Sequence, residues 1–254
     1  MSADRTEHMD LEDAEIIISQ RLRSMRLSAM ADAFEEQAQD PNAGLSTFME
    51  RFSALVEREW LVRYDKKFAR YLRNAHLRYP GADLDQTLYD PARKLDTVTI
   101  ERLSGCEWID EGRHLLVTGP SSSGKTYLCN ALCVCALRRF KSVRYIRANQ
   151  LMLELEQAHV KGKYMEALDE FCKLDLLVID DFGLMELDMD KCRNLFEVID
   201  SREGRKSMIV ISQFPVSKWF DIFKDHTYGD ATMQRLTDKR HSYRLEMNGI
   251  SMRR

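Results

Sequence analysis

The stretch Gly119-Pro-Ser-Ser-Ser-Gly-Lys-Thr126 fits the pattern G-x-x-x-x-G-K-[ST]. Apolar or small residues at 115–118 precede it and indicate a short buried strand, and the segment 127–140, free of Gly and Pro, indicates a helix. In that order, the backbone N–H groups of the loop and the start of the helix point at one spot, which suits phosphate oxygens. The stretch therefore predicts a nucleotide phosphate-binding loop, with Lys125 on the β- and γ-phosphates and the Thr126 hydroxyl on Mg²⁺. A Ser-rich surface loop is the alternative.

Composition sets broad limits on the rest of the chain. The 254 residues, 44% hydrophobic and 31% charged, suffice for one large domain or two modest ones. The net charge of −3 gives no indication of nucleic acid, so any such binding must come from local clusters. We expect a cytoplasmic protein without membrane contact, because there is no signal peptide, no long apolar run and no C-x-x-C pair. Cys129, Cys133 and Cys135 are interpreted as small helix-packing residues rather than metal ligands.

The first eighty residues carry no strand pattern. Residues 11–39 lack Gly and Pro and show apolar residues at helical spacing. Thr47 and Glu50 form a capping-box pattern that predicts the start of a longer helix, reaching about Ala75. We therefore predict an all-α N-terminal domain at 1–79, followed by a linker at 80–98.

The second of these helices has an uneven distribution of charge. Basic residues at i, i+3 and i+4 spacing form a stripe along one side, while aromatic residues such as Trp60 and Tyr64 fall on another. A basic stripe of this kind suits a phosphate backbone, but a solvated face over an aromatic core gives the same pattern. The stripe consists of Arg63, Lys66, Lys67, Arg70 and Arg73.

Residues 99–254 alternate between strand and helix patterns. This rhythm predicts an α/β domain with a parallel sheet and crossover helices. Trp108 and Ile109, ahead of the first strand, are candidates for the wall of an adenine pocket, although core packing explains them equally well. The expected elements are helices at 99–105, 149–159, 164–174 and 190–202, a last helix starting at Gly229-Asp230, and strands at 142–147, 176–181, 207–213 and 243–247.

The run Leu176-Leu-Val-Ile-Asp180-Asp181 ends a predicted buried strand in two carboxylates. Ligands bind at the carboxyl ends of strands in open α/β sheets. Asp180 is therefore expected to hold Mg²⁺ through its water shell, and Asp181 to orient or deprotonate the attacking water. Ser212 or Gln213, at the end of the next strand, is a candidate for the γ-phosphate or that water.

Four segments occur in the order seen in IstB-type insertion-sequence helper ATPases, and the chain resembles that family. They are 119–126, 177–184 (Leu-Val-Ile-Asp-Asp-Phe-Gly-Leu), 214–219 (Phe-Pro-Val-Ser-Lys-Trp) and 249–253 (Gly-Ile-Ser-Met-Arg). The resemblance implies an AAA+ ATPase that uses ATP and Mg²⁺, forms homo-oligomers on double-stranded DNA and assists an IstA-type transposase. The chain ends soon after the last expected strand, so we expect no helical lid of the kind that full AAA+ proteins carry. DnaC-like helicase loaders, which share the AAA+ core, remain the alternative function, ahead of a small-molecule phosphotransferase.

The resemblance also assigns roles to particular residues. Arg235 matches the arginine finger that reaches the γ-phosphate of the adjacent subunit, and with Lys125 and Asp181 it forms the predicted catalytic set. Departures from the family are Ser122 in place of Gly, Gln213 in place of Asn, and Gln234 in place of an acid. Asp181, shorter than the Glu of most AAA+ proteins, implies slow hydrolysis, and Arg253 is a candidate lid-like contact. The residues expected to hold the nucleotide are Gly119, Pro120, Ser121, Ser122, Ser123, Gly124, Lys125, Thr126, Tyr127 and Gln213.

Overall fold

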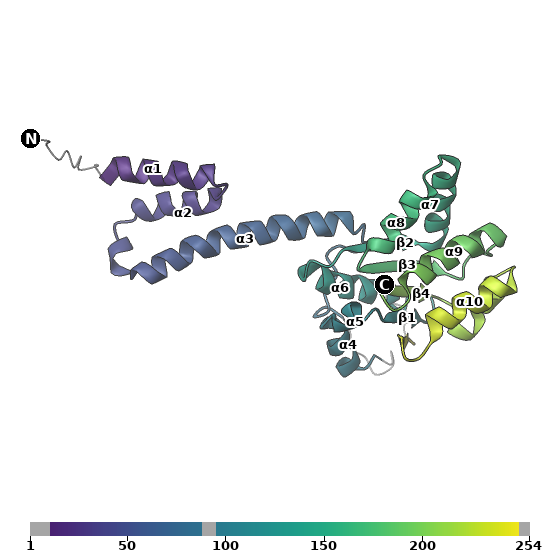
Figure 1. The fold of residues 1–254 in the computed structure, drawn as a ribbon. Coiled ribbons are helices and arrows are strands. Elements are labelled where there is room, and N and C mark those ends of the chain that lie inside the picture. Colours follow the sequence, from purple (N-terminus) through teal and green to yellow (C-terminus); the bar gives the residue numbers. More distant parts are fainter. Residues whose placement is uncertain (1–10, 88–94, 249–254) are drawn as a thin grey trace, which may run out of the picture. The chain divides into compact units, whose positions relative to one another are not determined.

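The computed structural model of the protein describes residues 11–87 and 95–248, which Figure 1 traces from purple to yellow. They divide into two compact units, the first ending at Ala69 and the second beginning at Arg70. The division falls inside a single long helix, α3 (Phe48–Asn74). The domain limits drawn from the sequence, with a boundary at 79 and a linker at 80–98, remain predictions, and residues 88–94 of that linker lie outside the described residues.

The first unit is helical, as the sequence predicted, but its first segment is two helices rather than one. The chain turns at Arg26, which adopts a left-handed φ of 61°. The N–H of Leu27 bonds to the carbonyl of Leu22, and that of Arg26 to Arg23, which satisfies carbonyl groups at the helix end. No Gly or Pro marks this break, so the sequence of 11–39 indicated a helical region without showing that it consists of two helices. The helices are α1 (Leu11–Ser24) and α2 (Ser28–Ala38).

The start of α3 is fixed by the capping box that the sequence predicted. The backbone N–H of Thr47 donates to the Glu50 carboxylate at 2.7 Å, and the Glu50 N–H donates to the Thr47 hydroxyl at 3.3 Å. These reciprocal bonds satisfy donors that the first helical turn leaves unpaired. Further along α3, the buried Glu59 accepts a bond from the N–H of Met30 at the start of α2. Trp60 stacks on Tyr64 but stays 57% exposed, so its packing in a core is not observed.

The second unit is built on a five-stranded sheet of order β2-β3-β4-β1-β5, in which every strand pair is parallel. The central strands are buried along their whole length because helices cover both faces, which explains their continuous apolar runs. The parallel α/β fold predicted from the sequence is confirmed. The strands are β1 (His114–Thr118), β2 (Val143–Arg147), β3 (Leu176–Phe182), β4 (Ser207–Ser212) and β5 (Ser242–Glu246).

Helices cover the sheet in two groups (Figure 1). Leu116, Leu177 and Val210 pack into one core cluster with residues of α7, α8, α9 and α10. Successive strand residues point to opposite faces, and α6 contacts β2 and β4 on the other side. The helices are α4 (Thr97–Ser104), α5 (Glu107–Asp110), α6 (Lys125–Arg138), α7 (Ala148–Val160), α8 (Tyr164–Lys173), α9 (Met189–Arg202) and α10 (His226–Thr237).

The last helix begins earlier than the sequence indicated. Asp225 caps α10 by accepting a bond from the N–H of Tyr228, so the helix already runs through Gly229. A Cβ on Gly229 would lie 3.0 Å from the ring of Phe220, and the glycine therefore serves close packing rather than a helix start. In the described part of the chain, which ends at residue 248, no helix follows β5. Arg253 and the segment 249–253 lie outside that part.

Candidate nucleotide site

The loop between β1 and α6 takes a backbone path that needs glycine at its start. Gly119 has a φ of 147°, and a Cβ there would lie 2.0 Å from the carbonyl oxygen of Met247, beyond any tolerable contact. Gly124 and Ser122 also have positive φ values, of 90° and 64°. The serine tolerates this conformation at a cost of about 1 kcal/mol. The loop thus delivers the chain to the N-terminus of α6, whose unpaired N–H groups favour anions.

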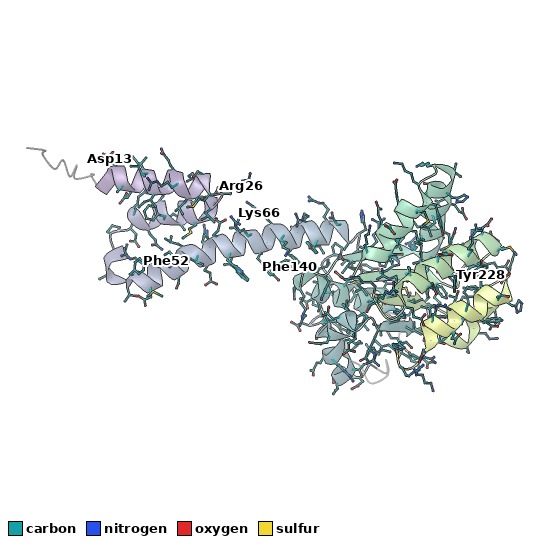
Figure 2. All side chains as sticks on the ribbon, viewed as in Figure 1. Asp13, Arg26, Phe52, Lys66, Phe140 and Tyr228 are labelled. Carbon is teal, nitrogen blue, oxygen red and sulfur yellow. The ribbon has the colours of Figure 1, made fainter. Side chains whose placement is uncertain are left out.

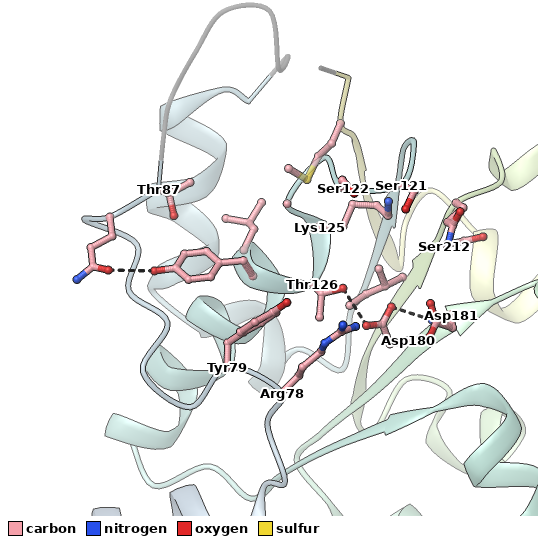
Figure 3. Close-up of a pocket in the computed structure, with 17 residues that line it drawn as sticks. Arg78, Tyr79, Thr87, Ser121, Ser122, Lys125, Thr126, Asp180, Asp181 and Ser212 are labelled. Carbon is pink, nitrogen blue, oxygen red and sulfur yellow. Dashed lines mark hydrogen bonds between the residues drawn. The ribbon is translucent and has the colours of Figure 1, made fainter. Parts of the chain in front are cut away.

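Lys125, the first residue of α6, folds back along this loop. Its ammonium donates to the carbonyl oxygens of Gly119 at 2.7 Å and Pro120 at 2.6 Å. Removal from water lowers the pKa of Lys125, against the raising effect of the nearby Asp180 carboxylate. Figure 3 shows the side chain beside Ser121 and Ser122. The ammonium is therefore held by carbonyl groups of the loop itself.

The Asp180 carboxylate is buried, with 2% of the residue exposed, and is held by three hydrogen bonds. Its Oδ2 accepts from the Thr126 hydroxyl at 2.9 Å and from the Tyr145 hydroxyl at 2.6 Å. Its Oδ1 accepts from the backbone N–H of Asp181 at 2.7 Å. The structure thus brings together Thr126, in the first turn of α6, and Asp180, near the end of β3 (Figure 3). Tyr145 was not foreseen, because in the sequence it is one aromatic residue of a strand pattern.

Asp181 occupies an irregular point of the sheet. Its φ is 57°, and the pairing of β3 with β4 shifts register between Ile179 and Phe182. This bulge turns the Asp181 side chain away from the ladder, and its carboxylate forms an ion pair with Arg147 at 3.5 Å. Adjacent aspartates in a regular strand point to opposite faces. The irregularity is thus what allows Asp180 and Asp181 to border one cavity.

That cavity has a volume of about 460 Å³, within the range typical of ligand sites. Most of the predicted loop residues line it, together with Asp180, Asp181 and Gln213. Ser212 also lines it, but its hydroxyl donates to the Phe182 carbonyl and accepts from the N–H of Phe214, which leaves Gln213 the better candidate for ligand contact. The lining residues not foreseen from the sequence are Arg78, Tyr79, Gln86, Thr87, Leu128, Ile211 and Met247.

The segment after α3 closes one side of this cavity. The Tyr79 N–H donates to the side chain of Asn130 at 2.9 Å, and the Tyr79 ring lies 6.0 Å from that of Tyr127. The Asp83 N–H reaches the Tyr127 hydroxyl at 3.2 Å, which ties the segment to α6 a second time. Polar backbone bonds and two aromatic faces make this side suitable for a flat base.

The adenine wall expected at Trp108 and Ile109 was wrong. Both residues are buried, 4% and 3% exposed, and neither lines the cavity. The indole N–H of Trp108 donates to the carbonyl of Leu103 at 2.9 Å, as buried indoles generally require. Their apolar side chains are part of the core, which was the alternative interpretation of this segment.

Arg235 does not border the cavity of its own chain. Its guanidinium bonds to the carboxylate of Asp200 at 2.7 Å, lies 3.2 Å from Glu203, and covers the ring of Phe196 at 4.8 Å. These contacts hold the side chain against α9, with 24% of it exposed. Arg235 therefore has no contact with the cavity of its own chain, and its role as an arginine finger stays a prediction.

The basic stripe of α3 is exposed throughout. Lys66 projects from the middle of the helix (Figure 2), whereas Arg63 is engaged with Glu59 at 2.6 Å and with the carbonyl of Arg26. Arg63, Lys66 and Lys67 belong to the first unit, and Arg70 and Arg73 to the second. The five stripe residues thus all belong to α3, three of them in the first unit and two in the second.

The family described as IstB-like ATP binding protein matches residues 20–254. The chain belongs to this family. It is 37% identical over 234 residues to an insertion sequence ATP-binding protein of Sinorhizobium fredii, covering 92% of this chain and 94% of that protein. It is 38% identical over 197 residues to an insertion sequence ATP-binding protein of Pseudomonas fluorescens, covering 78% and 85% of the two chains.

Solved structures show the fold of this IstB-type protein. The DnaC helicase loader superposes with a TM-score of 0.58 at 20% identity, covering 67% of this chain and 98% of that one. DnaI superposes with a TM-score of 0.56 at 19% identity, covering 72% and 93%. These likenesses establish the AAA+ fold and nothing about activity. Among the described residues, no helix combines the length and apolarity needed to cross a bilayer.

Proposed function

We propose that this IstB-type protein is an ATP-dependent transposition helper: it assembles with copies of itself on double-stranded DNA and assists an IstA-type transposase. The observation that carries the proposal is the convergence of Lys125, Thr126, Asp180 and Asp181 on one cavity. This set provides a cation and backbone donors for phosphate, oxygen ligands for a hard metal, and a carboxylate for water. Family membership and relatives named as insertion sequence ATP-binding proteins support the transposition context.

The site's residues fit ATP with Mg²⁺. The metal prefers oxygen ligands, typically one or two carboxylates together with phosphates and water. Asp180 is a buried carboxylate already bonded to the Thr126 hydroxyl, and the pair offers such oxygens beside the phosphate loop. When bound, Mg²⁺ neutralises charge that develops on the phosphates. Lys125 supplies a second positive charge, for which it must exchange its bonds to loop carbonyls for phosphate oxygens.

Hydrolysis in this proposal needs a second copy of the chain. Asp181 orients the attacking water and is the predicted base, restrained by its ion pair with Arg147. Arg235 acts in trans on the γ-phosphate of a neighbouring copy, after leaving Asp200 and Glu203. A guanidinium held by two carboxylates in the free chain and released on assembly makes hydrolysis slow until copies meet. Turnover would then report assembly rather than drive metabolism.

The basic stripe of α3 is the proposed DNA contact. Its side chains are exposed, and copies assembled on one duplex would sum several weak phosphate contacts. Backbone contacts of this type carry little sequence information. DNA binding by the stripe should therefore weaken as salt is added and depend little on base sequence.

The decisive experiment measures particle size and duplex DNA binding with ATP, with ADP and with neither. The transposition helper forms larger particles and binds DNA with ATP, and Lys125→Ala loses both because it loses ATP. ATP-dependent assembly without DNA binding would favour a helicase loader, whose helical domain binds protein. A monomer in all three conditions would contradict both and leave a small-molecule phosphotransferase.

A charge-reversal variant tests the stripe itself. Replacing Lys66, Lys67 and Arg70 by Glu should weaken DNA binding and flatten its dependence on salt, since each lost phosphate contact removes about 0.9 from the slope. The matched control replaces three exposed lysines of the second unit by Glu and changes the net charge equally. An equal loss of binding in the control would show a general charge effect and refute the stripe. The control residues are Lys161, Lys163 and Lys239.

A further inference from the structure

Tyr145 lies behind the Asp180 carboxylate, outside the residues that line the cavity. Its hydroxyl donates to Asp180 Oδ2 at 2.6 Å, and the same oxygen accepts the Thr126 hydroxyl at 2.9 Å. The backbone N–H of Asp181 donates to the other oxygen, Oδ1. Because both carboxylate oxygens accept hydrogen bonds, the rotation of the carboxylate is fixed as well as its position. The hydroxyl of Tyr145 therefore contacts the Asp180 carboxylate, which lines the cavity, without lining the cavity itself.

The tyrosine is itself held on two sides. Residue 145 pairs with Val178 in the register of β2 with β3. On the other edge of β2, its backbone N–H donates to the carbonyl of Ala75, one residue beyond α3, at 2.8 Å. The residue is 7% exposed. The backbone of Tyr145 is thus fixed by the sheet on one edge and by the end of α3 on the other, and it cannot shift without moving one of them.

We propose that Tyr145 is a positioning residue for Mg²⁺, whose hydroxyl keeps the Asp180 carboxylate in the orientation that serves the metal's ligand shell. This inference rests on the proposed use of ATP with Mg²⁺. Hydrogen-bond donors to a ligating carboxylate orient it, and a buried carboxylate that loses one becomes free to rotate. Because Ala75 holds the same residue, the last turn of α3 is joined through Tyr145 to the metal-facing carboxylate.

The test compares Tyr145→Phe with wild type in binding of a fluorescent ATP analogue, first in EDTA and then at graded Mg²⁺. The variant removes one oxygen and keeps the buried ring, and a melting curve without nucleotide checks that it is folded. We expect the Mg²⁺ concentration that gives half of the Mg²⁺-dependent gain in analogue binding to rise about tenfold. This is the range found when a residue that hydrogen-bonds a metal ligand is replaced. Affinity in EDTA should stay within about twofold of wild type, since Tyr145 touches no phosphate-binding group.

Tyr164→Phe is the matched control. Tyr164 is a half-buried tyrosine of α8 whose hydroxyl has no hydrogen-bond partner among the described residues. It should show the Mg²⁺ requirement of wild type. In an Asp180→Asn background, Tyr145→Phe should have no further effect, because the two substitutions act on one interaction.

Three results separate the inference from the function on which it rests. A wild-type Mg²⁺ requirement in Tyr145→Phe would overturn the positioning role while leaving ATP binding intact. An equal loss of affinity with and without Mg²⁺ would also overturn it, since that is the signature of a purely structural role. A wild-type protein that binds no ATP under any condition would instead refute the proposed function.

Discussion

His114, the first residue of β1, is a buried histidine with neither ring nitrogen hydrogen-bonded among the described residues. It is 1% exposed. Removal from water, followed by the nearby positive charges of Arg202 and His241, lowers the pKa of His114 from 6.5 to about 4. Arg202 is itself buried and donates to the carbonyl oxygens of Phe171 and Ser207. The folded protein therefore holds His114 neutral across the physiological range.

The lowered pKa makes stability depend on pH in a definite direction. In the unfolded chain His114 takes up a proton near pH 6.5, whereas in the folded chain it does so only near pH 4. Between these values the unfolded state binds more protons, so the free energy of unfolding falls as the pH falls. The contribution lost between pH 7 and pH 5 is about 2 kcal/mol, at about 1.4 kcal/mol for each pH unit well inside the window. Above about pH 8 the histidine is neutral in both states and contributes almost no slope.

His114→Leu removes the titrating group and keeps a similar volume. At pH 7 and above, its stability should equal or exceed that of wild type, because a buried polar ring without partners is replaced by an apolar one. Urea unfolding at several pH values measures the difference, with tryptophan fluorescence of Trp108 and Trp219 reporting on this unit. Other acids and bases cancel in the difference between the two proteins. An identical pH slope in wild type and His114→Leu would refute the reasoning.

Two further substitutions test the nucleotide site. Gly119→Ala places a Cβ 2.0 Å from the Met247 carbonyl oxygen, so the loop must move at a cost of about 1–3 kcal/mol. ATP binding should weaken by an order of magnitude or more, while circular dichroism shows that the helices are retained. Unchanged affinity would contradict the loop geometry. Arg235→Ala should leave ATP binding unchanged but slow ATP hydrolysis by the assembled protein by roughly three orders of magnitude. Mixing this variant with Asp181→Asn should restore part of the hydrolysis. No restoration in the mixture would argue against a finger acting in trans.

The sequence determined the elements whose signals lie within a few residues. The pattern at Gly119–Thr126 predicted the loop because its glycines adopt backbone conformations that other residues rarely take, such as the φ of 147° at Gly119. Thr47 and Glu50 predicted the start of α3 because a capping box is completed within one turn. The apolar runs predicted a buried parallel sheet, since a strand covered on both faces has no polar alternation.

The residue types in a short segment did not give the correct helix boundaries at two places. Arg26, just beyond the end of α1, adopts a left-handed conformation although the sequence has no glycine there. Gly229, taken as a helix start, lies inside α10, where its missing side chain admits the ring of Phe220. At Gly229, packing against Phe220 rather than intrinsic helix preference explains the residue.

The tertiary structure alone decided which side chains meet. The strand order β2-β3-β4-β1-β5 carries β2 next to β3, so that the hydroxyl of Tyr145 reaches Asp180, and no pattern along the chain encodes that order. The same folding brings Tyr79 to the cavity and buries Trp108 in the core. A sequence motif indicates the local conformation of a short segment. The contacts of Tyr145, Tyr79 and Trp108 depend instead on the pairing of strands that are distant in the sequence, and these strands stabilise one another only in the assembled sheet.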